Sequence, residues 1–236
     1  MLNPKNYGLF CLVLCVFVLI SAVGLSHAGD VIATWGDEDE HTVFVIDPGH
    51  GGEDGGTTDA TGRRESEINL EISLRLRDLL QFLGAKTVMI RDGDYSIATE
   101  GNTVAARKVS DIRNRVRLVE DTSYSRLISI HQNHYPEEKY RGAQVFYSPT
   151  TGSKEWANAL QDILTSQVDP QNRRECKKAG EIYLLEHIHC PAILVECGFM
   201  SNPQEAVILQ EASYQKKLVA AIACCAMTMP EEINEI

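Results

Sequence analysis

In the stretch VFVIDPGHGGEDGG, residues Val43 to Gly56, an apolar run stops at Asp47 and is followed by a proline, five glycines and one histidine. Val43 to Ile46 is long enough for a buried strand, and the Pro-Gly pair that follows is typical of a turn. The glycines allow the loop to fold tightly and to hold His50 close to the strand end. The stretch therefore predicts a strand whose carboxyl end presents a histidine.

Strand and helix patterns alternate along the rest of the chain. Strands are predicted at residues 43–46, 86–90, 126–131, 142–147, 182–185 and 192–196, and helices at 66–83, 107–120, 154–166 and 214–227. This alternation predicts a single α/β domain, with a mostly parallel twisted sheet and helices on both faces. A functional site is expected at the carboxyl ends of the strands.

The amino-terminal region differs in kind from the rest. Residues 9–25 form an almost unbroken apolar run, preceded by Lys5 and followed by Ser26, His27 and Ala28. At about 1.5 Å per helical residue the run spans roughly 25 Å, slightly less than the hydrocarbon core of a bilayer. We expect residues 1–28 to be an export signal or membrane anchor, which takes the protein across the cytoplasmic membrane. Residues 29–42 are then a linker, 43–230 the catalytic domain and 231–236 a tail.

Charge and cysteine content exclude some classes of partner and site. The chain has 22 Lys and Arg against 33 Asp and Glu, a net charge of -11, which argues against nucleic acid or an anionic membrane surface as the main partner. Five of the seven cysteines lie beyond residue 28, an odd number, and none forms a CxxC pair. A complete disulfide framework and a structural zinc site on thiolates are therefore not expected.

One acidic residue falls on the buried face of the first predicted helix. At about 100° per residue, Glu65 projects onto the apolar face, whereas Glu67 falls roughly opposite it. A buried carboxylate needs a partner, and Asn69, one turn later, is placed to hydrogen-bond it. The apolar positions that define the face are Ile68, Ile72, Leu76, Leu79 and Leu83.

Three other polar residues stand where apolar strands end: His50, His131 and Glu196. In a parallel sheet they would meet at one rim, with Glu65 beside them. Two imidazoles and a carboxylate form a catalytic zinc set that leaves one position open, so His50, Glu65 and His131 are the predicted ligands. Glu196 is then the predicted general base, which takes a proton from the attacking water.

Four strings carry a family resemblance. In order, IDPGHGGEDGG, GRRESEINLEIS, LISIHQN and AILVECGFMSNPQEA resemble the four blocks of the zinc-dependent N-acetylmuramoyl-L-alanine amidases of bacterial cell walls. The resemblance implies that His50, Glu65 and His131 bind Zn²⁺ and that Glu196 is catalytic. It also implies hydrolysis of the amide between the lactyl group of muramic acid and L-alanine, with peptidoglycan as the partner.

Within that family, the short chain and residues 97–120 look most similar to the sporulation and germination amidases that strip stem peptides from spore cortex ahead of muramic-lactam formation. This implies a place at the spore envelope. It also leaves room for a protein partner that loads zinc or targets the enzyme, since no wall-binding repeat is seen. Two residues depart from the family pattern: His134 in HQNH, which could crowd or assist the site, and Cys197 after the catalytic glutamate, which could be an extra soft ligand.

Several other readings remain open. Arg91, Asn133, Arg141 and Gln144 border the proposed rim and are candidate substrate contacts, or solvated loop residues. His187 and His189 form a candidate second metal site, and Cys197 a candidate nucleophile. GHGGEDGG could be a phosphate loop, although Glu53 and Asp54 oppose an anion. His131 could be a core histidine and Glu196 a structural ion-pair partner. The alternative functions are a catalytically idle wall-binding module and a zinc endopeptidase that cuts within the stem peptide.

Overall fold

A computed structural model describes residues 42–230 as one α/β unit. Its sheet has six strands in the order β2-β1-β3-β6-β4-β5. The strands are β1 (Val43–Pro48), β2 (Lys86–Met89), β3 (Ser125–Asn133), β4 (Gln144–Tyr147), β5 (Lys177–Lys178) and β6 (Ala192–Phe199). The helices are α2 (Glu65–Phe82), α3 (Val104–Glu120), α4 (Ser153–Ile163), α5 (Tyr183–Glu186), α6 (Pro203–Ile208) and α7 (Ala212–Thr228), and a π-helical turn (Leu164–Val168) follows α4. The predicted export segment, nearly all of the linker and the tail lie outside the described residues.

All neighbouring strands run parallel except β4 and β6, which are antiparallel. The register places His131 of β3 opposite Glu196 of β6, and Glu196 opposite Gln144 of β4. The pairing shifts between His131 and Asn133, which marks a bulge at the rim. The predicted mostly parallel sheet is confirmed, and the register brings two of the predicted site residues side by side.

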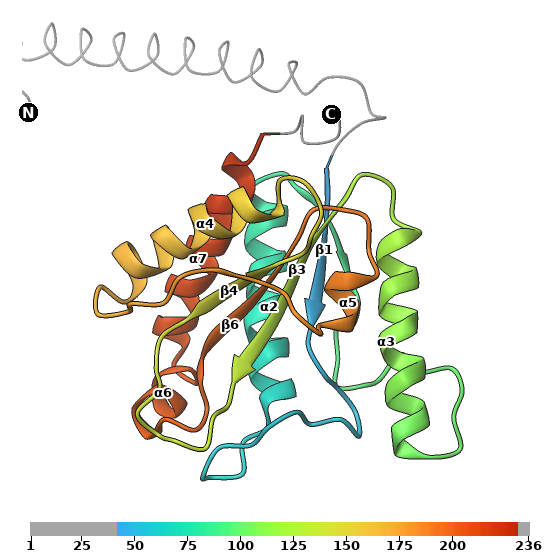
Figure 1. Ribbon diagram of the computed structural model, residues 1–236, viewed down its shortest axis with the longest axis horizontal. Coiled ribbons are helices and arrows are strands. Elements are labelled where there is room, and N and C mark those ends of the chain that lie inside the picture. Colours follow the sequence, from blue (N-terminus) through green and yellow to red (C-terminus); the bar gives the residue numbers. More distant parts are fainter. Residues whose placement is uncertain (1–41, 231–236) are drawn as a thin grey trace, which may run out of the picture. The chain divides into compact units, whose positions relative to one another are not determined.

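Helices cover both faces of the sheet, as predicted (Figure 1). Alternate residues of each strand point to opposite faces. Ile46, Ile130 and Val195 pack with side chains of α2, α4 and α7 in the larger hydrophobic core. Val45, Leu127 and Leu194 pack on the other face with side chains of α3 and α5. The sheet is therefore buried on both sides, which explains the continuous apolar runs of β1, β3 and β6.

The predicted strand at 182–185 is wrong, because this segment forms the one-turn helix α5. Leu184 and Leu185 are both buried, and a short apolar run of this kind does not distinguish a strand from a buried helical turn. The edge of the sheet is instead formed by Lys177 and Lys178 of β5, two exposed cations that give no strand signal. Helix α3 begins three residues before the predicted start, where the Thr103 hydroxyl accepts from the Ala106 N–H at 3.2 Å.

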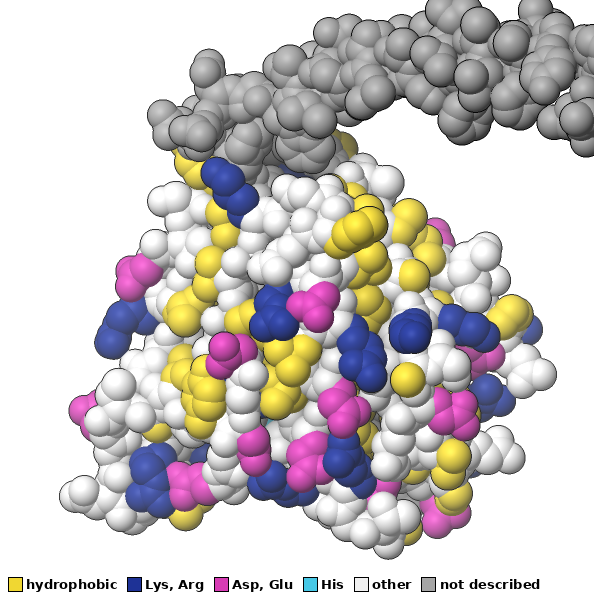
Figure 2. Space-filling model, turned by 180° about the vertical axis from the view of Figure 1, so that it is seen from behind, with side chains coloured by type: hydrophobic (Ala, Val, Ile, Leu, Met, Phe, Trp, Pro, Cys, Tyr) yellow, Lys and Arg dark blue, Asp and Glu magenta, His cyan; other side chains and the backbone are white. Residues whose placement is uncertain are grey.

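The surface carries mixed charge. On the face seen in Figure 2, acidic and basic side chains are interspersed, and no region of that face has a single sign. Within residues 42–230, no helix is long and apolar enough to cross a membrane.

A buried ion pair joins helix α3 to the carboxyl end of β1. The Arg115 guanidinium donates to the carboxylate of Asp47, and both side chains are almost fully buried. Ser129 of β3 donates to the other oxygen of Asp47 at 2.6 Å, and Asp111 accepts from Arg115 Nε at 2.6 Å. These bonds tie β1, β3 and α3 together directly beneath the rim.

Replacing Arg115 with methionine should therefore destabilise the protein by about 3–5 kcal/mol, because the Asp47 carboxylate is left buried without its cation. The free energy of unfolding, measured in urea without added metal, checks this. Arg117→Met is the matched control, since Arg117 is exposed on the same helix, and its side chain hydrogen-bonds Asn114 and forms no ion pair within residues 42–230. Equal stability of the two variants would contradict the role given to the pair.

Candidate functional site

The loop after β1 holds His50 in an unusual backbone conformation. His50 has φ +62°, in the left-handed region that non-glycine residues seldom adopt. Two buried arginines fix the loop through its carbonyl groups: Arg91 donates to the carbonyls of Pro48 and Gly49 at 2.9 Å each, and Arg115 donates to that of His50 at 2.8 Å. The strained conformation is thus maintained by the surrounding structure.

Glu65 is the first residue of α2, and its side chain is buried as the helical-face pattern predicted. Its carboxylate accepts hydrogen bonds from the backbone N–H groups of Thr57 at 3.0 Å and Gln132 at 3.1 Å. The predicted bond from the Asn69 amide is present at 3.3 Å. The buried charge is compensated by groups from the loop, from α2 and from β3.

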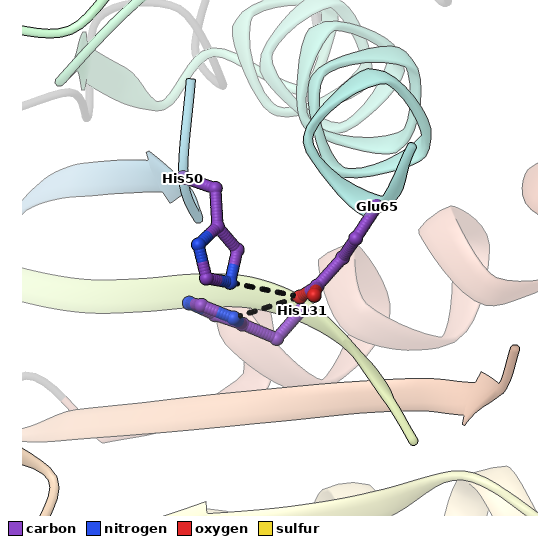
Figure 3. A group of neighbouring side chains, drawn as sticks. All are labelled: His50, Glu65 and His131. Carbon is purple, nitrogen blue, oxygen red and sulfur yellow. Dashed lines mark hydrogen bonds and ion pairs between the residues drawn. The ribbon is translucent and has the colours of Figure 1, made fainter. Parts of the chain in front are cut away.

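His50, Glu65 and His131 converge on one point (Figure 3). Oε1 of Glu65 lies 3.3 Å from Nε2 of His50 and 3.1 Å from Nδ1 of His131. One ligand atom from each residue lies within 4.8 Å of the others, and the two imidazole rings meet edge to face. Three segments remote in sequence therefore form one site that is able to hold a metal ion.

Two glycines leave the space that this convergence needs. A Cβ on Gly49 would stand 2.2 Å from Nε2 of His131, and one on Gly56 would stand 2.5 Å from Oε2 of Glu65. Gly56 also has φ +67°. Side chains at these positions would displace the proposed ligands, so both glycines are required by the close approach of the loop.

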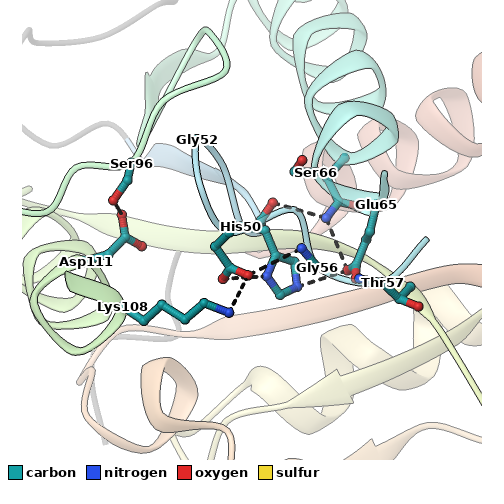
Figure 4. Close-up of polar contacts among 12 residues, drawn as sticks. His50, Gly52, Gly56, Thr57, Glu65, Ser66, Ser96, Lys108 and Asp111 are labelled. Carbon is teal, nitrogen blue, oxygen red and sulfur yellow. Dashed lines mark hydrogen bonds and ion pairs between the residues drawn. The ribbon is translucent and has the colours of Figure 1, made fainter. Parts of the chain in front are cut away.

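The far side of His50 is held by an acid that the sequence analysis did not assign to the site. Nδ1 of His50 bonds Asp54 Oδ2 at 2.9 Å, and Lys108 of α3 pairs with Asp54 Oδ1 at 2.7 Å (Figure 4). A carboxylate on the second nitrogen is the usual support of a metal-binding histidine. An acid four residues after His50 in a glycine-rich loop was the available signal.

The surroundings of two predicted ligands, Glu65 and His50, favour opposite charges on them. Burial would raise the pKa of Glu65, but the hydrogen bonds from His131 and His50 hold it far below its usual range. Burial would lower the pKa of His50, but its bonds to Asp54 and Glu65 raise that pKa to about 9. In the metal-free protein the ionised carboxylate of Glu65 therefore lies beside a protonated His50, and a metal ion has to displace that proton.

Glu196 of β6 points to the same side of the sheet as His131, its register partner. Its Oε2 atom is buried and has no hydrogen-bond partner among residues 42–230. Burial, together with the nearby charge of Glu65, raises the pKa of Glu196 to about 7, although the neighbouring histidines act against this. A carboxyl group with a pKa near neutrality beside a metal site is suited to accept and return a proton.

The donor set fits a catalytic divalent ion. Two imidazoles and one carboxylate supply three ligands, the carboxylate is already ionised, and Asp54 supports one imidazole from behind. Glu196 stands on the same rim, and its Oε2 atom is buried without a hydrogen-bond partner among residues 42–230. Among residues 42–230 this is the only group of His, Cys, Asp and Glu side chains with metal-ligand spacing.

The four candidate substrate residues differ in their exposure to solvent. Arg91 is completely buried and bonds carbonyl groups of the chain, so its predicted substrate contact is incompatible with this position. Gln144 is also buried, and its side chain bonds Glu175 and Arg174. Asn133 is half-buried at the rim, and Arg141 is exposed and paired with Asp169. The structure therefore leaves Asn133 as the predicted contact nearest to the ligands.

The remaining candidates lie outside the site. Cys197 points into the larger core, and burial strongly raises the pKa of its thiol, which is unsuited to a nucleophile or ligand. His134 is exposed and does not belong to the group of metal-ligand residues. The imidazole of His187 stacks on Tyr183, and that of His189 pairs with Glu120, so the two histidines form no shared site.

Comparison with known proteins adds to this geometry. Residues 44–225 match the N-acetylmuramoyl-L-alanine amidase family. The chain is 39% identical over 184 residues to the germination-specific N-acetylmuramoyl-L-alanine amidase of Bacillus subtilis, with 76% of each chain covered. It resembles the CwlD amidase of Clostridioides difficile, solved in complex with the GerS lipoprotein, with a TM-score of 0.77, 34% identity, and 80% of this chain and 98% of that chain covered. It also resembles an N-acetylmuramoyl-L-alanine amidase of Clostridium difficile 630, with a TM-score of 0.71, 29% identity, and coverage of 80% and 97%.

Metal affinity should depend on pH through His50. Below pH 9 the metal-free protein carries a proton on His50, which a metal ion must displace. The affinity for Zn²⁺ should therefore rise about tenfold per pH unit between pH 7 and 8.5 and fall as the pH is lowered. Competition with a chelating dye in a non-coordinating buffer measures this, and an affinity that stays constant over the range would exclude His50 as a ligand.

Replacing Asp54 with asparagine should weaken Zn²⁺ binding by about 10- to 100-fold at pH 8.5, because His50 loses the carboxylate that orients its ring. The same competition assay measures the loss. Glu53→Gln is the matched control, since Glu53 is the adjacent acid and pairs with Arg107 instead. A similar affinity in both variants would show that Asp54 does not support the site.

Proposed function

Since the chain belongs to the N-acetylmuramoyl-L-alanine amidase family, we propose that it uses Zn²⁺ to remove stem peptides from spore cortex peptidoglycan ahead of muramic-lactam formation. The bond that breaks is the amide between the lactyl group of muramic acid and L-alanine. His50, Glu65 and His131 would hold the ion, and Glu196 is the catalytic residue. The convergence of these three ligands beside the unpaired oxygen of Glu196 carries the proposal.

Each side chain has a separate task. When bound, Zn²⁺ acts as a Lewis acid that polarises the carbonyl group and makes water more acidic. The Glu196 carboxylate accepts a proton from the attacking water, whose oxygen bonds to the lactyl carbonyl carbon. Glu196 then gives that proton to the nitrogen of L-alanine as the C–N bond breaks, which leaves a carboxyl group on the glycan and a free amino terminus on the peptide.

The cortex role is supported by the similarity to the germination-specific amidase of Bacillus subtilis and by the likeness to the CwlD amidase. That amidase was solved in complex with a lipoprotein. We therefore also propose that this protein has a protein partner, which loads the metal or positions the enzyme. The apolar run at residues 9–25 supports export across the bacterial cytoplasmic membrane to the spore envelope, as a secreted or membrane-anchored protein.

Replacing Glu196 with glutamine should lower kcat by about 10²- to 10⁴-fold, since the variant loses the proton acceptor but keeps the shape of the side chain. Zn²⁺ content should stay near one ion per chain. Glu155→Gln, on the exposed side of α4, is the control and should retain full activity. An active Glu196→Gln enzyme would remove the role given to this residue.

The reaction products distinguish the proposed amidase from an endopeptidase and from an idle wall-binding module. The wild-type enzyme should release intact stem peptides with new L-alanine amino termini from cortex peptidoglycan, and a chelator should stop the release. Mass spectrometry of the fragments measures both. Cuts within the peptide would indicate an endopeptidase, binding without release would indicate an idle wall-binding module, and release that ignores the chelator would exclude the zinc mechanism.

A further inference from the structure

A second charged group lies at the rim and takes no part in holding a metal. Arg174 lies in the segment between the π-helical turn and β5, next to the start of β4. Its Nε donates to the carbonyl of Arg141 at 2.7 Å and its Nη1 to the side-chain oxygen of Gln144 at 3.0 Å. Its guanidinium carbon lies 4.4 Å from the centre of the Phe199 ring. The group is half-buried and lies over the Phe199 ring at cation–π distance.

The charge of Arg174 has no direct counter-ion. Among residues 42–230, no carboxylate lies within ion-pair distance of it, and its Nη2 has no hydrogen-bond partner. Glu205 and Glu196 act on its charge only from farther away. By contrast, other arginines of this acidic chain pair directly with carboxylates, among them Arg63, Arg64, Arg107 and Arg115. A partly desolvated guanidinium with a vacant donor is a ready site for a carboxylate from another molecule.

The chain segment that carries Arg174 is fixed by hydrogen bonds. Its backbone N–H donates to the Asn172 side chain at 2.9 Å, and the Asn172 amide donates to the carbonyl of Ala143 at 2.8 Å. Gly142 has φ +93°, and a Cβ there would stand 2.4 Å from the Asn172 oxygen, so the two segments are in close contact. Little side-chain entropy would therefore be lost when a ligand binds.

Arg174 lies close to Glu196 along the rim. Gln144 lies opposite Glu196 on the adjacent strand, and its side-chain oxygen accepts from Arg174 at 3.0 Å, so the Gln144 side chain alone stands between the guanidinium and the backbone position facing Glu196. The Glu196 charge acts on that of Arg174. Two residues of extended peptide span roughly 7 Å. A stem peptide that extends from a scissile amide at Glu196 toward β4 would therefore bring its second residue close to the guanidinium.

We propose that Arg174 forms a carboxylate subsite, which binds the free carboxylate of the residue that follows L-alanine in the stem peptide. The subsite rests on the proposed amidase function and adds a selection among substrates: stem peptides with a carboxylate at that residue are preferred over those with a neutral carboxamide. The glycan can also offer a carboxylate, on muramic acid that carries no peptide. The two sources are separated by using substrates with a single muramic residue.

The test uses two soluble muramoyl peptides that differ only in a carboxylate or a carboxamide on the second residue of the peptide. With the full-length, zinc-loaded enzyme, kcat/KM should be about 10- to 100-fold higher for the carboxylate form, the range of one charge-assisted hydrogen bond, and mostly through KM. In Arg174→Gln the ratio of the two kcat/KM values should fall to about 1, because cleavage of the carboxylate form slows while that of the carboxamide form changes less than about threefold.

Two variants and a stability measurement complete the design. Arg174→Lys keeps the charge and should retain part of the preference. Arg173→Gln is the matched control, because Arg173 is the exposed neighbour that donates only to backbone carbonyls, and its ratio should equal that of the wild type. Zn²⁺ content should be unchanged in all three variants. Arg174→Gln should stay folded at the assay temperature but unfold at a lower temperature than the wild type, because the buried Gln144 oxygen loses its donor.

The results that would overturn the Arg174 subsite differ from the result that would overturn the proposed amidase function. Equal cleavage of both substrates by the wild type would overturn the subsite alone. An equal loss on both substrates in Arg174→Gln would also overturn it, since the residue would then act only on the local structure. A wild-type enzyme that cleaves neither substrate would overturn the proposed function, and the subsite with it.

Discussion

The structure depends on one buried negative charge. The carboxylate of Glu65 is withdrawn from water at the start of α2, and an isolated charge in that position would be costly. Backbone N–H groups of Thr57 and Gln132, the Asn69 amide and two imidazoles surround it. Since these partners come from the first loop, from α2 and from β3, satisfying this single carboxylate brings the main parts of the rim together and at the same time builds a cation site.

The second requirement is a backbone conformation that the chain would not adopt by itself. His50 is left-handed, which costs on the order of 1–2 kcal/mol for a residue with a side chain. Arg91 and Arg115 offset this cost by donating to consecutive carbonyls of the loop, and Arg115 is in turn neutralised by Asp47 under the sheet. The backbone strain at His50 is thus offset by hydrogen bonds from Arg91 and Arg115 and by the buried ion pair of Arg115 with Asp47.

Prediction from sequence succeeded where a pattern reports directly on geometry. Helical spacing separated Glu65 from Glu67, and the ends of buried strands marked His131 and Glu196, because burial imposes a periodicity that polar residues interrupt. It failed where contacts join distant segments. Arg91 was expected to touch substrate but lies beneath the loop, and neither the support of His50 by Asp54 nor the placement of Arg174 on Phe199 leaves a periodic signal. The wrong strand at 182–185 shows the same limit, since α5 and a buried strand share one apolar pattern.

Because β4 runs antiparallel to its neighbour β6, a connecting segment of the chain lies at the rim. In β1, β3 and β6 the rim lies at the carboxyl end of each strand, but antiparallel β4 begins there, so Gln144 is its first residue. The chain between β3 and β4 consequently both leaves and re-enters the sheet at the rim. Sequence changes in that connecting segment are therefore expected to alter which molecules fit beside the sheet, without moving the strand ends that carry the proposed metal ligands and Glu196.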